Sequence, residues 1–497
     1  MTKSKPCFLA LDQGGHSSRA ILFDERGRLL AQSKRRVGTS ISDEGWIEQD
    51  PMELVSSLRE VVATVDGRRS GLPAHRIAKA GMATQRSSIV CWDRQTGEPL
   101  TPVISWQDVR AAQGLEGLSD KFSEIHRRTG LFPNAHFGAT KLRWCLDEVP
   151  AVQRAFAEDR LAFGPLASFL LYHLLDERPL LVDAGNAART LLCNIETGDW
   201  DLELLSWFEL PAQALPRCVP TRFDYGHLSV GNERVPFCIA NGDQAAALFA
   251  HGALARDTLI ANVGTGAFLS LPVGSVPIAC SRLLSSLVCQ DEEKRQFAVE
   301  GTVNAALGAI EWVVEALVEE GTLTSESTTK EGLRALLEKV ACWLEEETQP
   351  PLFLNGVSGL GAPFWQADFP SQFVGDGSVA AKLVAAVESI AFLLQANLDE
   401  MRRGVSAAPR QIRMTGGLAS LDGLCQRLAD LSGLLVTRPE MIEATAQGTA
   451  FLLAGQPSSW KLDPGTARCF EPKENPALNQ RYARWSHEME QVIQSLG

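Results

Sequence analysis

The chain has 497 residues, of which 45% are hydrophobic and 22% are charged, and its formal net charge is −13. That length predicts two large or three smaller domains, and the acidic balance argues against general nucleic-acid binding. The 11 cysteines are scattered without Cys-x-x-Cys spacing, which favours a reducing compartment over a disulfide framework or a zinc site.

The first hundred residues contain strand-like segments around one helix-like segment. A helix is predicted over 50–65, because apolar residues recur there at helical spacing behind an aspartate N-cap and a proline in the first turn. The strands predicted in this region cover 8–11, 19–24, 28–33, 77–85 and 88–93. The first two of them form a β-hairpin near the start of the chain.

The loop of this hairpin has a composition suited to phosphate. Gly14 and Gly15 let backbone N–H groups approach an anion closely, and Arg19 can supplement them. Asp12 stands at the mouth of the loop, where its carboxylate could hold Mg²⁺ through water. Gly, Ser and Asp are also ordinary turn residues, so a plain turn with an Asx cap is the alternative interpretation.

Two apolar segments bear on cellular location. The run before Asp12 is too short for a signal peptide, and the uncharged segment 161–175 falls short of the ~20 residues of a membrane helix. We interpret 161–175 as one buried helix. We therefore expect a cytoplasmic protein with no membrane and no nucleic acid among its partners.

A second hairpin is predicted over 258–273, and its loop is Gly264-Thr265-Gly266. A hairpin with a glycine-containing loop therefore recurs halfway along the chain, at a separation too long for a solenoid repeat. Two matching loops favour phosphate binding over two unrelated turns. The recurrence predicts two domains, over 1–252 and 253–497, with an alanine-rich helix over 245–255 at their boundary.

The second half continues with alternating helix-like and strand-like segments. The predicted helices cover 303–320, 380–401 and 422–433, and the predicted strands cover 351–355, 411–417 and 434–438. Such alternation argues for an α/β fold. The tail after residue 457 is rich in proline and charge, and it ends in a predicted surface helix.

Asp243 occupies a predicted strand-to-helix junction within PFCIANGDQAAALFA, residues 236–250. An aspartate at such a junction can be only a helix N-cap. The carboxyl end of a strand is also where α/β proteins place catalytic carboxylates. A base in this position could accept a hydroxyl proton and so prepare an alcohol to attack phosphorus.

Arg86, Trp106 and Asp108 lie at predicted strand ends in the first half. A tryptophan can stack on the apolar face of a sugar or polyol, while arginine and aspartate can bond its hydroxyls. Taken singly, each is more often a core aromatic or a salt-bridge partner. Gly416-Gly417 ends another predicted strand and could let a nucleotide lie against bare backbone, with a tight turn as the alternative.

A series of motifs resembles the FGGY carbohydrate kinases, in the same order, over about residues 6–455, and resembles the glycerol kinases most among them. LDQGGHSSRAILFD (11–24) resembles the family's first phosphate hairpin, NGDQAAALF (241–249) its catalytic segment and GTGAF (264–268) its second phosphate hairpin. The other matching motifs are GWIEQDP, ATQR, SWQDVR, TGLFPNAHFGATKLRW, NAARTLLCNIETGDWD, SGLGAPFW, VESIAF and TGGLAS.

The resemblance implies two actin-like (ribonuclease H-fold) domains flanking a central cleft, in which the first binds a sugar or polyol and the second binds ATP with Mg²⁺. It implies that Asp243 is the general base and that Asp12 and Asp243 lie near the metal. The substrate contacts implied are Arg86, Ser87, Trp106, His136, Asp243 and Gln244. The ATP contacts implied are Gly14, Gly15, Arg19, Gly264, Thr265, Gly266, Gly308, Glu311, Gly416 and Gly417. Family members also imply a homodimer or homotetramer.

Some positions depart from the family pattern. Ser87 stands where glycerol kinases carry a glutamate that accepts hydrogen bonds from the polyol, and His136 replaces a pocket tyrosine. The other departures are Gly15-His16 for Thr-Thr in the first phosphate loop and Leu421, beside Asp422, for the adenine-side asparagine. Because a site built for particular hydroxyls discriminates strongly, the two pocket changes put glycerol itself in question.

Three functional hypotheses follow. The first is an ATP-dependent kinase of a small sugar or polyol whose primary hydroxyl reaches Asp243. The second is a catalytically weak, ligand-sensing relative that regulates a partner; the altered positions motivate it, but a sensor has no need of the base at Asp243. The third is an actin-like ATPase or filament protein, which leaves Trp106 and Arg86 unexplained.

Overall fold

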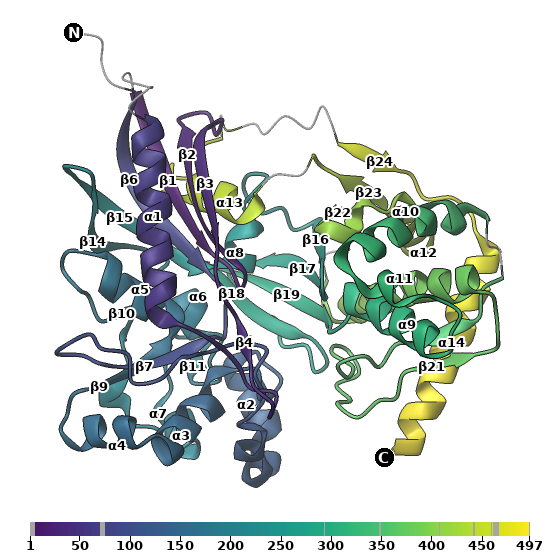
Figure 1. The fold of residues 1–497 in the computed structure, drawn as a ribbon, viewed down its shortest axis with the longest axis horizontal. Helices are drawn as coiled ribbons and strands as arrows, with labels where there is room; N and C mark the ends of the chain where they lie inside the picture. The colour runs from purple at the N-terminus through teal and green to yellow at the C-terminus, as the bar shows by residue number, and fades with distance from the viewer. Residues whose placement is uncertain are drawn as a thin grey trace.

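The computed structural model describes residues 5–69, 75–292, 294–346, 349–406, 408–440, 443–458, 460 and 467–496. Within these residues the chain builds two large β-sheets, one in each half of the molecule, with helices packed around both (Figure 1). The predicted α/β class is therefore confirmed. The described part of the predicted tail ends in α14 (Pro476–Leu496), which packs through Leu478, Trp485 and Met489.

The sheet of the first half has six strands in the order β14-β15-β6-β1-β2-β3. They are β1 (Lys5–Gln13), β2 (Ser17–Asp24), β3 (Leu29–Arg36), β6 (His75–Thr84), β14 (Arg222–Val230) and β15 (Glu233–Gly242). Strands β1 and β2 form the predicted antiparallel hairpin, whereas β1, β6 and β15 run parallel. The carboxyl ends of these three parallel strands therefore meet at one edge of the sheet.

Helix α1 (Pro51–Arg69) packs against this sheet, on β2 and β3. Oδ1 of Asp50 accepts hydrogen bonds from the backbone N–H of Met52 at 2.7 Å and of Glu53 at 3.1 Å, so Asp50 caps the helix. The apolar face of α1 is buried in a core that it shares with the strands. The predicted helix and its cap are confirmed.

A smaller five-stranded sheet, in the order β4-β5-β8-β7-β9, extends the first half. Its strands are β4 (Ser40–Ile41), β5 (Ile47–Gln49), β7 (Ile89–Asp93), β8 (Val103–Ile104) and β9 (Leu161–Pro165). The helices of this region are α2 (Phe122–Thr129), α3 (Gly138–Glu148), α4 (Pro150–Ala157), α5 (Leu166–Leu174), α6 (Ala184–Ala187) and α7 (Leu202–Trp207). Short strands complete it: β10 (Leu181–Asp183), β11 (Cys193–Asn194), β12 (Asp199–Trp200) and β13 (Arg217–Val219).

The prediction of one helix over 161–175 is wrong. Its first part is strand β9, which pairs antiparallel with β7, and only its second part is helix α5. The division falls at Pro165, because a proline inside a helix has no N–H for the hydrogen bond and clashes with the preceding turn. The helix accordingly begins at Leu166.

The sheet of the second half has seven strands in the order β18-β19-β17-β16-β22-β23-β24. They are β16 (Thr258–Val263), β17 (Ala267–Gly274), β18 (Leu284–Gln290), β19 (Arg295–Val303), β22 (Gln411–Thr415), β23 (Leu435–Arg438) and β24 (Arg468–Phe470). A separate pair is β20 (Leu352–Leu354) and β21 (Gln372–Val374). The main helices are α9 (Leu307–Glu319), α10 (Lys330–Glu346), α11 (Val379–Gly404) and α12 (Asp422–Ser432). The second predicted hairpin, β16–β17, is confirmed.

Helix α11 is long and apolar enough to cross a membrane by length and composition, and among the described residues it alone meets that test. Most of its surface is nevertheless buried inside the protein, where it packs against α9, α12 and β19. Its apolar character is accounted for by its place in the core of the second half.

The two halves interlock at helices α8 (Asp243–Ala247) and α13 (Ala444–Leu453). Although α13 lies between β23 and β24 of the second sheet in the chain, it packs against α8, β1 and β6 of the first half. The predicted helix over 245–255 is thus too long: it ends at Ala247, and turns follow in which residues 249, 250 and 252 bond to carbonyls three positions earlier. Gly448 of α13 lies directly against the Ala246 carbonyl of α8, so there is no space for a side chain at this position.

Candidate active site

The register of the parallel strands places Asp12, Arg86 and Asp243 at the same edge of the first sheet. Asp12 pairs with Ala83, which pairs with Asn241, so β1, β6 and β15 end together. Asp243 follows β15 directly and opens α8, while Arg86 follows β6. The predicted strand-to-helix junction at Asp243 is therefore present, and it lies beside the first glycine-containing hairpin.

Asp243 is half-buried as a residue. Its Oδ1 accepts a hydrogen bond from the backbone N–H of Gln244 at 2.7 Å. Burial raises the pKa of Asp243, and the positive charges of Arg86 and Arg189 act in the opposite direction. Asp243 is thus a carboxyl group with an elevated pKa that lies within the electrostatic influence of two guanidinium groups.

Asp12 is only 3% exposed, and its Oδ2 lies 2.7 Å from Nη1 of Arg19. Burial, together with the nearby negative charge of Asp243, raises the pKa of Asp12 to about 6, although Arg19 opposes the shift. Arg19 also reaches Glu443, with 3.3 Å between Nε and Oε2. Asp12 and Asp243 therefore share one electrostatic environment.

These two carboxylates fit a magnesium ion that is only partly held by protein. Two nearby acidic groups whose pKa values are raised are relieved by a cation, and oxygen is the ligand that Mg²⁺ prefers. Within the described residues no group of three or more His, Cys, Asp and Glu side chains forms a metal cage. Such a donor set matches Mg²⁺ bound by one or two carboxylates, with water and substrate phosphates as the other ligands.

Arg86 is tied to both halves of the molecule. Its Nη2 donates to Oε1 of Gln244, and its Nη1 lies 3.3 Å from Oε1 of Glu300 on β19. The other carboxylate oxygen of Glu300 lies 3.2 Å from Nη1 of Arg189. Arg189 in turn stands over the ring of Phe137, 5.3 Å from its centroid.

Trp106 and His136 contact each other beside this group. Trp106 is 39% exposed. Its backbone N–H donates to Oγ of Ser88 at 3.0 Å, and its backbone carbonyl lies 3.0 Å from Nδ1 of His136. Burial lowers the pKa of His136. Ser87 is partly exposed and adopts a φ of 64°, a left-handed conformation that is uncommon for serine.

A buried lysine holds these loops in place. Nζ of Lys141 donates to the carbonyls of Ser105 at 2.6 Å and His136 at 2.9 Å. Burial lowers the pKa of Lys141 to about 7. Its role in supporting Trp106 and His136 depends on two loops that the sequence pattern does not bring together.

The suggestion that Asp108 bonds substrate hydroxyls is wrong. Its carboxylate is buried and accepts hydrogen bonds from the backbone N–H of Ile47 at 2.7 Å and from two nitrogens of Arg110 at 3.0 and 2.7 Å. Asp108 is therefore the salt-bridge partner of the alternative interpretation. It fixes the segment that carries Trp106.

The second hairpin loop meets the start of α9. The carbonyl of Thr265 accepts hydrogen bonds from Ala306 N–H at 2.7 Å and Gly308 N–H at 3.4 Å, and that of Gly264 accepts from Leu307 N–H at 3.1 Å. Glu311 lies one turn further along α9. The fold thus brings Gly264, Thr265, Gly266 and Gly308 together.

Gly416 joins the same neighbourhood from β22. Its φ is 95°, and a side chain there would clash with the Val263 carbonyl at the end of β16. A Cβ added at Gly417 would meet nothing within 4 Å. In the departing segment, Leu421 is buried, and Asp422 forms ion pairs with Arg438 and Arg468.

In the first hairpin loop, part of the backbone is already engaged. Gly14 N–H donates to the Ser17 carbonyl at 3.0 Å, and the Gly15 carbonyl accepts from Nε2 of Gln49 at 2.8 Å. Gly15 itself stays partly accessible, and His16 is exposed. The loop is therefore a fixed turn that leaves His16 and part of Gly15 open to solvent.

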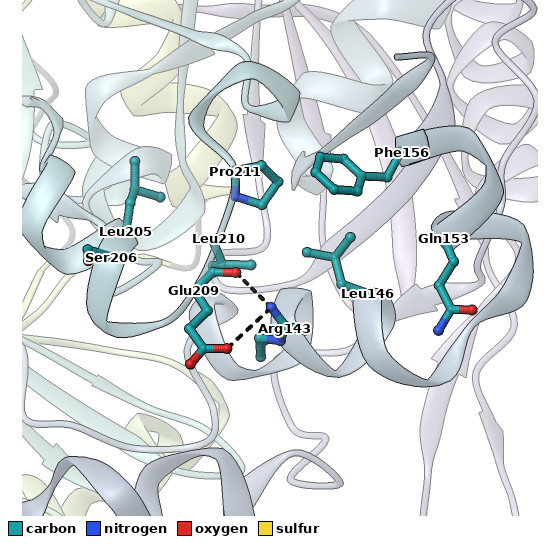
Figure 2. Close-up of a pocket in the computed structure, with 9 residues that line it drawn as sticks. All are labelled: Arg143, Leu146, Gln153, Phe156, Leu205, Ser206, Glu209, Leu210 and Pro211. Carbon is teal, nitrogen blue, oxygen red and sulfur yellow. Dashed lines mark hydrogen bonds and ion pairs between the residues drawn. The ribbon is translucent and has the colours of Figure 1, made fainter. Parts of the chain in front are cut away.

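A small cavity lies between the two sets of residues. Its walls include Gln244 from α8, Asn262 and Phe268 from the second hairpin, and Thr415 from β22. A larger surface pocket of about 500 Å³ lies elsewhere, between α3, α4 and α7 (Figure 2). It contains none of the predicted site residues, and Arg143 there bonds to Glu209, as the dashed lines in Figure 2 show.

Glu300 and Arg189 were not singled out as site residues by the sequence. A signal was present for Glu300, because it is a lone charge inside the apolar strand run FAVEGTV. Arg189 lies within NAARTLL and had no distinguishing pattern of its own. Both lie far from Arg86 along the chain, so their contact could not be predicted from spacing.

Comparison with known proteins now identifies the family. Residues 7–250 match the model of the N-terminal domain of the FGGY family of carbohydrate kinases, and residues 259–455 match that of its C-terminal domain. The chain belongs to the FGGY family of carbohydrate kinases. The resemblance seen in the motifs is confirmed, and the chain is a carbohydrate kinase that uses ATP with Mg²⁺.

Relatives cover nearly the whole chain. Glycerol kinase of Rhodopirellula baltica is 34% identical over 99% of this chain and 92% of its own length, and that of Alkalilimnicola ehrlichii is 36% identical over 96% of both. Plasmodium falciparum glycerol kinase with ADP superimposes with a TM-score of 0.85 at 22% identity, covering 98% of each chain. Xylulose kinase of Rhodospirillum rubrum gives a TM-score of 0.82 at 20% identity, covering 99% of each. The predicted two-domain actin-like fold is confirmed.

Proposed function

We propose that this kinase transfers the γ-phosphoryl group of ATP to a primary hydroxyl of a small sugar or polyol, with Asp243 as the general base. The strand register that brings Asp243 beside Asp12 and Arg86 is the observation that carries the proposal. A carboxylate there can accept the hydroxyl proton as the oxygen attacks phosphorus. Its elevated pKa makes it a stronger base than an ordinary aspartate.

Asp12 and Asp243 would hold the Mg²⁺ ion that accompanies ATP. The ion, when bound, neutralises charge on the phosphate oxygens. Asp12 orients its carboxylate by pairing with Arg19, which lies in the same hairpin. Arg19, Gly14 and Gly15 would approach the terminal phosphates from the first half.

The second half would supply the rest of the nucleotide site. Thr265 is exposed at the tip of its loop, and Gly264 and Gly266 on either side are partly accessible. The remaining nucleotide contacts proposed are Gly308, Glu311, Gly416 and Gly417. Bare backbone at such glycines lets phosphate and ribose approach closely.

The acceptor would lie among Arg86, Ser87, Trp106, His136 and Gln244. The relatives named glycerol kinase support a polyol. Ser87 offers a neutral hydroxyl where a carboxylate acceptor is usual in that group, and His136 offers a ring nitrogen in place of a phenol. We therefore propose a polyol or ketose other than glycerol, with Trp106 stacking on its carbon face.

The decisive experiment measures coupled ADP release with glycerol, erythritol, ribulose, xylulose and gluconate, each with and without the substitution Asp243→Asn. We expect one acceptor to stimulate release and the variant to lose that stimulation. Release that is unchanged in the variant would contradict the assignment of the base. No release with any acceptor, together with ATP binding in calorimetry, would instead support the ligand-sensing regulator.

Three wider expectations belong to the same proposal. Domains over 1–252 and 253–497 are supported by the separate sheets and by the two family models. A cytoplasmic location is supported by 11 cysteines that are all free. A homodimer or homotetramer follows from the family resemblance, and light scattering on the purified protein tests it.

A further inference from the structure

We propose that Glu300 is a positioning residue that sets the orientation of Arg86 and links the acceptor site to the phosphate hairpin of the second half. This inference rests on the acceptor site proposed around Arg86. It assigns to Glu300 no contact with substrate. Its effect reaches the acceptor through Arg86 and Arg189.

The geometry is that of one carboxylate between two guanidinium groups. Glu300 is 1% exposed, and its two oxygens divide between Arg86 at 3.3 Å and Arg189 at 3.2 Å. Both arginines come from the first half, at the ends of β6 and α6, whereas Glu300 lies on β19 of the second. The ion pairs therefore cross between the halves.

Charge explains why the glutamate is needed. Arg86 is 8% exposed and Arg189 is 6% exposed, so two positive groups lie close together with little water to screen them. Burial and the nearby charge of Arg86 lower the pKa of Arg189 to about 10, which is the expected sign of this repulsion. Without Glu300 the two guanidinium groups would separate, and Arg86 is the one beside Gln244 and Asp243.

Arg86 has little freedom apart from this contact. Its aliphatic stem lies on Gly242, where an added Cβ would be 2.6 Å from its Cγ and Cδ. Its Nη2 donates to Gln244, the neighbour of Asp243. Glu300 is thus one of the contacts that decide which way the guanidinium of Arg86 faces.

The strand that carries Glu300 also supports the second phosphate hairpin. In the antiparallel pairing of β17 with β19, Glu300 stands opposite Ser270, and Val303 stands opposite Ala267, next to Gly266. A Cβ at Gly266 would lie 2.8 Å from the Val303 carbonyl, so loop and strand are in close contact. A shift of the loop is therefore passed along β19 to Glu300 and on to Arg86.

The test compares steady-state kinetics of the full-length wild-type enzyme with those of Glu300→Gln, using the acceptor found in the panel. We expect the acceptor KM to rise by about tenfold or more, with the ATP KM changed by less than about threefold. Glu388 of α11 supplies a matched control, because it is 3% exposed and bridges Arg427 at 3.2 Å and Arg481 at 2.6 Å. Glu388→Gln should lower thermal stability and leave both KM values unchanged.

A double substitution separates charge compensation from general damage. Glu300→Gln leaves both guanidinium charges unbalanced, and adding Arg189→Met removes one of them. We expect the double variant to regain part of the acceptor affinity that Glu300→Gln loses, whereas independent structural damage would add. Additive losses, or an acceptor KM in Glu300→Gln equal to that of the wild type, would overturn the inference.

Failure of this inference is distinguishable from failure of the proposed function. If the wild-type enzyme shows no acceptor-dependent ADP release, the proposed function fails. If Glu300→Gln does not fold by circular dichroism, Glu300→Asp replaces it, since that variant keeps the charge and shortens the reach. An acceptor KM unchanged in Glu300→Asp then overturns the positioning role, and a raised one supports it.

Discussion

The two glycine-containing hairpins share a backbone shape but differ in chemistry. In the first, β1–β2, the loop is flanked by the ion pair of Asp12 and Arg19. In the second, β16–β17, the loop carries no charged side chain, and its carbonyls bond to the N–H groups that open α9. The first hairpin therefore carries charged side chains, whereas the second is held in place by backbone hydrogen bonds.

This difference shows that a repeated element need not repeat its function. Both loops expose glycine at the end of a strand, and each lies at an edge where two more parallel strands end, β6 and β15 for the first loop and β22 and β23 for the second. The second is placed against the start of a helix. What each hairpin can do is decided by the neighbours that the rest of the chain supplies. Substitutions in the two loops should accordingly differ in kind.

The largest effect should come from Asp243, at the edge shared with the first hairpin. Asp243→Asn keeps the shape and removes the base, so kcat should fall by about 10²–10⁴-fold, the usual contribution of a positioned acid or base. ATP affinity, measured by calorimetry, should stay within about threefold of wild type. An equal loss of kcat and of ATP affinity would show that the contributions of the two hairpins to catalysis and to nucleotide binding cannot be separated.

Asp12 should contribute to the response to pH, together with Asp243, whose pKa is also raised. The pKa of Asp12 is raised to about 6 from an ordinary 3.8, so between these values the folded state binds more protons than the unfolded state. The free energy of unfolding should then fall as the pH rises through this window, by about 3 kcal/mol at most, since each pKa unit is worth ~1.4 kcal/mol. Urea titrations without Mg²⁺ would measure this.

The matched variant is Asp12→Asn, which should reduce that slope. It should also raise the Mg²⁺ concentration needed for half-maximal activity by about tenfold. For the wild type, Mg²⁺ affinity should improve as the pH rises through about 6, because the carboxylate must lose its proton to bind a cation. A slope in Asp12→Asn as steep as that of the wild type would assign the titration to another group.

Gly266 tests the backbone character of the second hairpin. An added Cβ would lie 2.8 Å from the Val303 carbonyl, so Gly266→Ala forces the loop away from β19. We expect a loss of about 1–3 kcal/mol in stability and a raised ATP KM, with no change in Mg²⁺ dependence. Gly117→Ala is the control, because nothing lies within 4 Å of the added Cβ and the residue lies outside the proposed nucleotide site.

The smallest effect should come from Thr265, whose backbone carbonyl makes its observed contacts. Thr265→Ala keeps that carbonyl and removes only an exposed hydroxyl. We expect the ATP KM to rise by about fivefold or less, corresponding to ~1 kcal/mol for one hydrogen bond. A loss of activity as large as that of Asp243→Asn would show that the Thr265 side chain takes part in the reaction, and this would contradict the comparison of the two hairpins.

Local sequence patterns predicted much of the framework. Apolar runs and glycine-containing loops fixed both hairpins, and an aspartate followed by proline marked the start of α1. The strand-to-helix junction at Asp243 was predictable for the same reason, since strand, turn and helix are contiguous there. The prediction of a single helix over 161–175 was wrong because the apolar residues of this segment suit a buried strand as well as a helix.

Asp108 shows where local patterns stop being informative. Its position at a strand end suits a pocket residue, and only the fold reveals that Ile47 and Arg110 occupy its oxygens. The same holds for Lys141, whose partners lie on two separate loops.

The sequence by itself determined the family, the α/β framework and the candidates at Asp12 and Asp243, because each depends on residues that are neighbours along the chain. Only the tertiary structure decided that Glu300 joins Arg86 to Arg189, and that α13 returns to pack on the first half. Those contacts link residues more than a hundred positions apart. These contacts form only when both sheets are packed together, because a charge that is buried away from water is stable only when an opposite charge or a hydrogen bond compensates it.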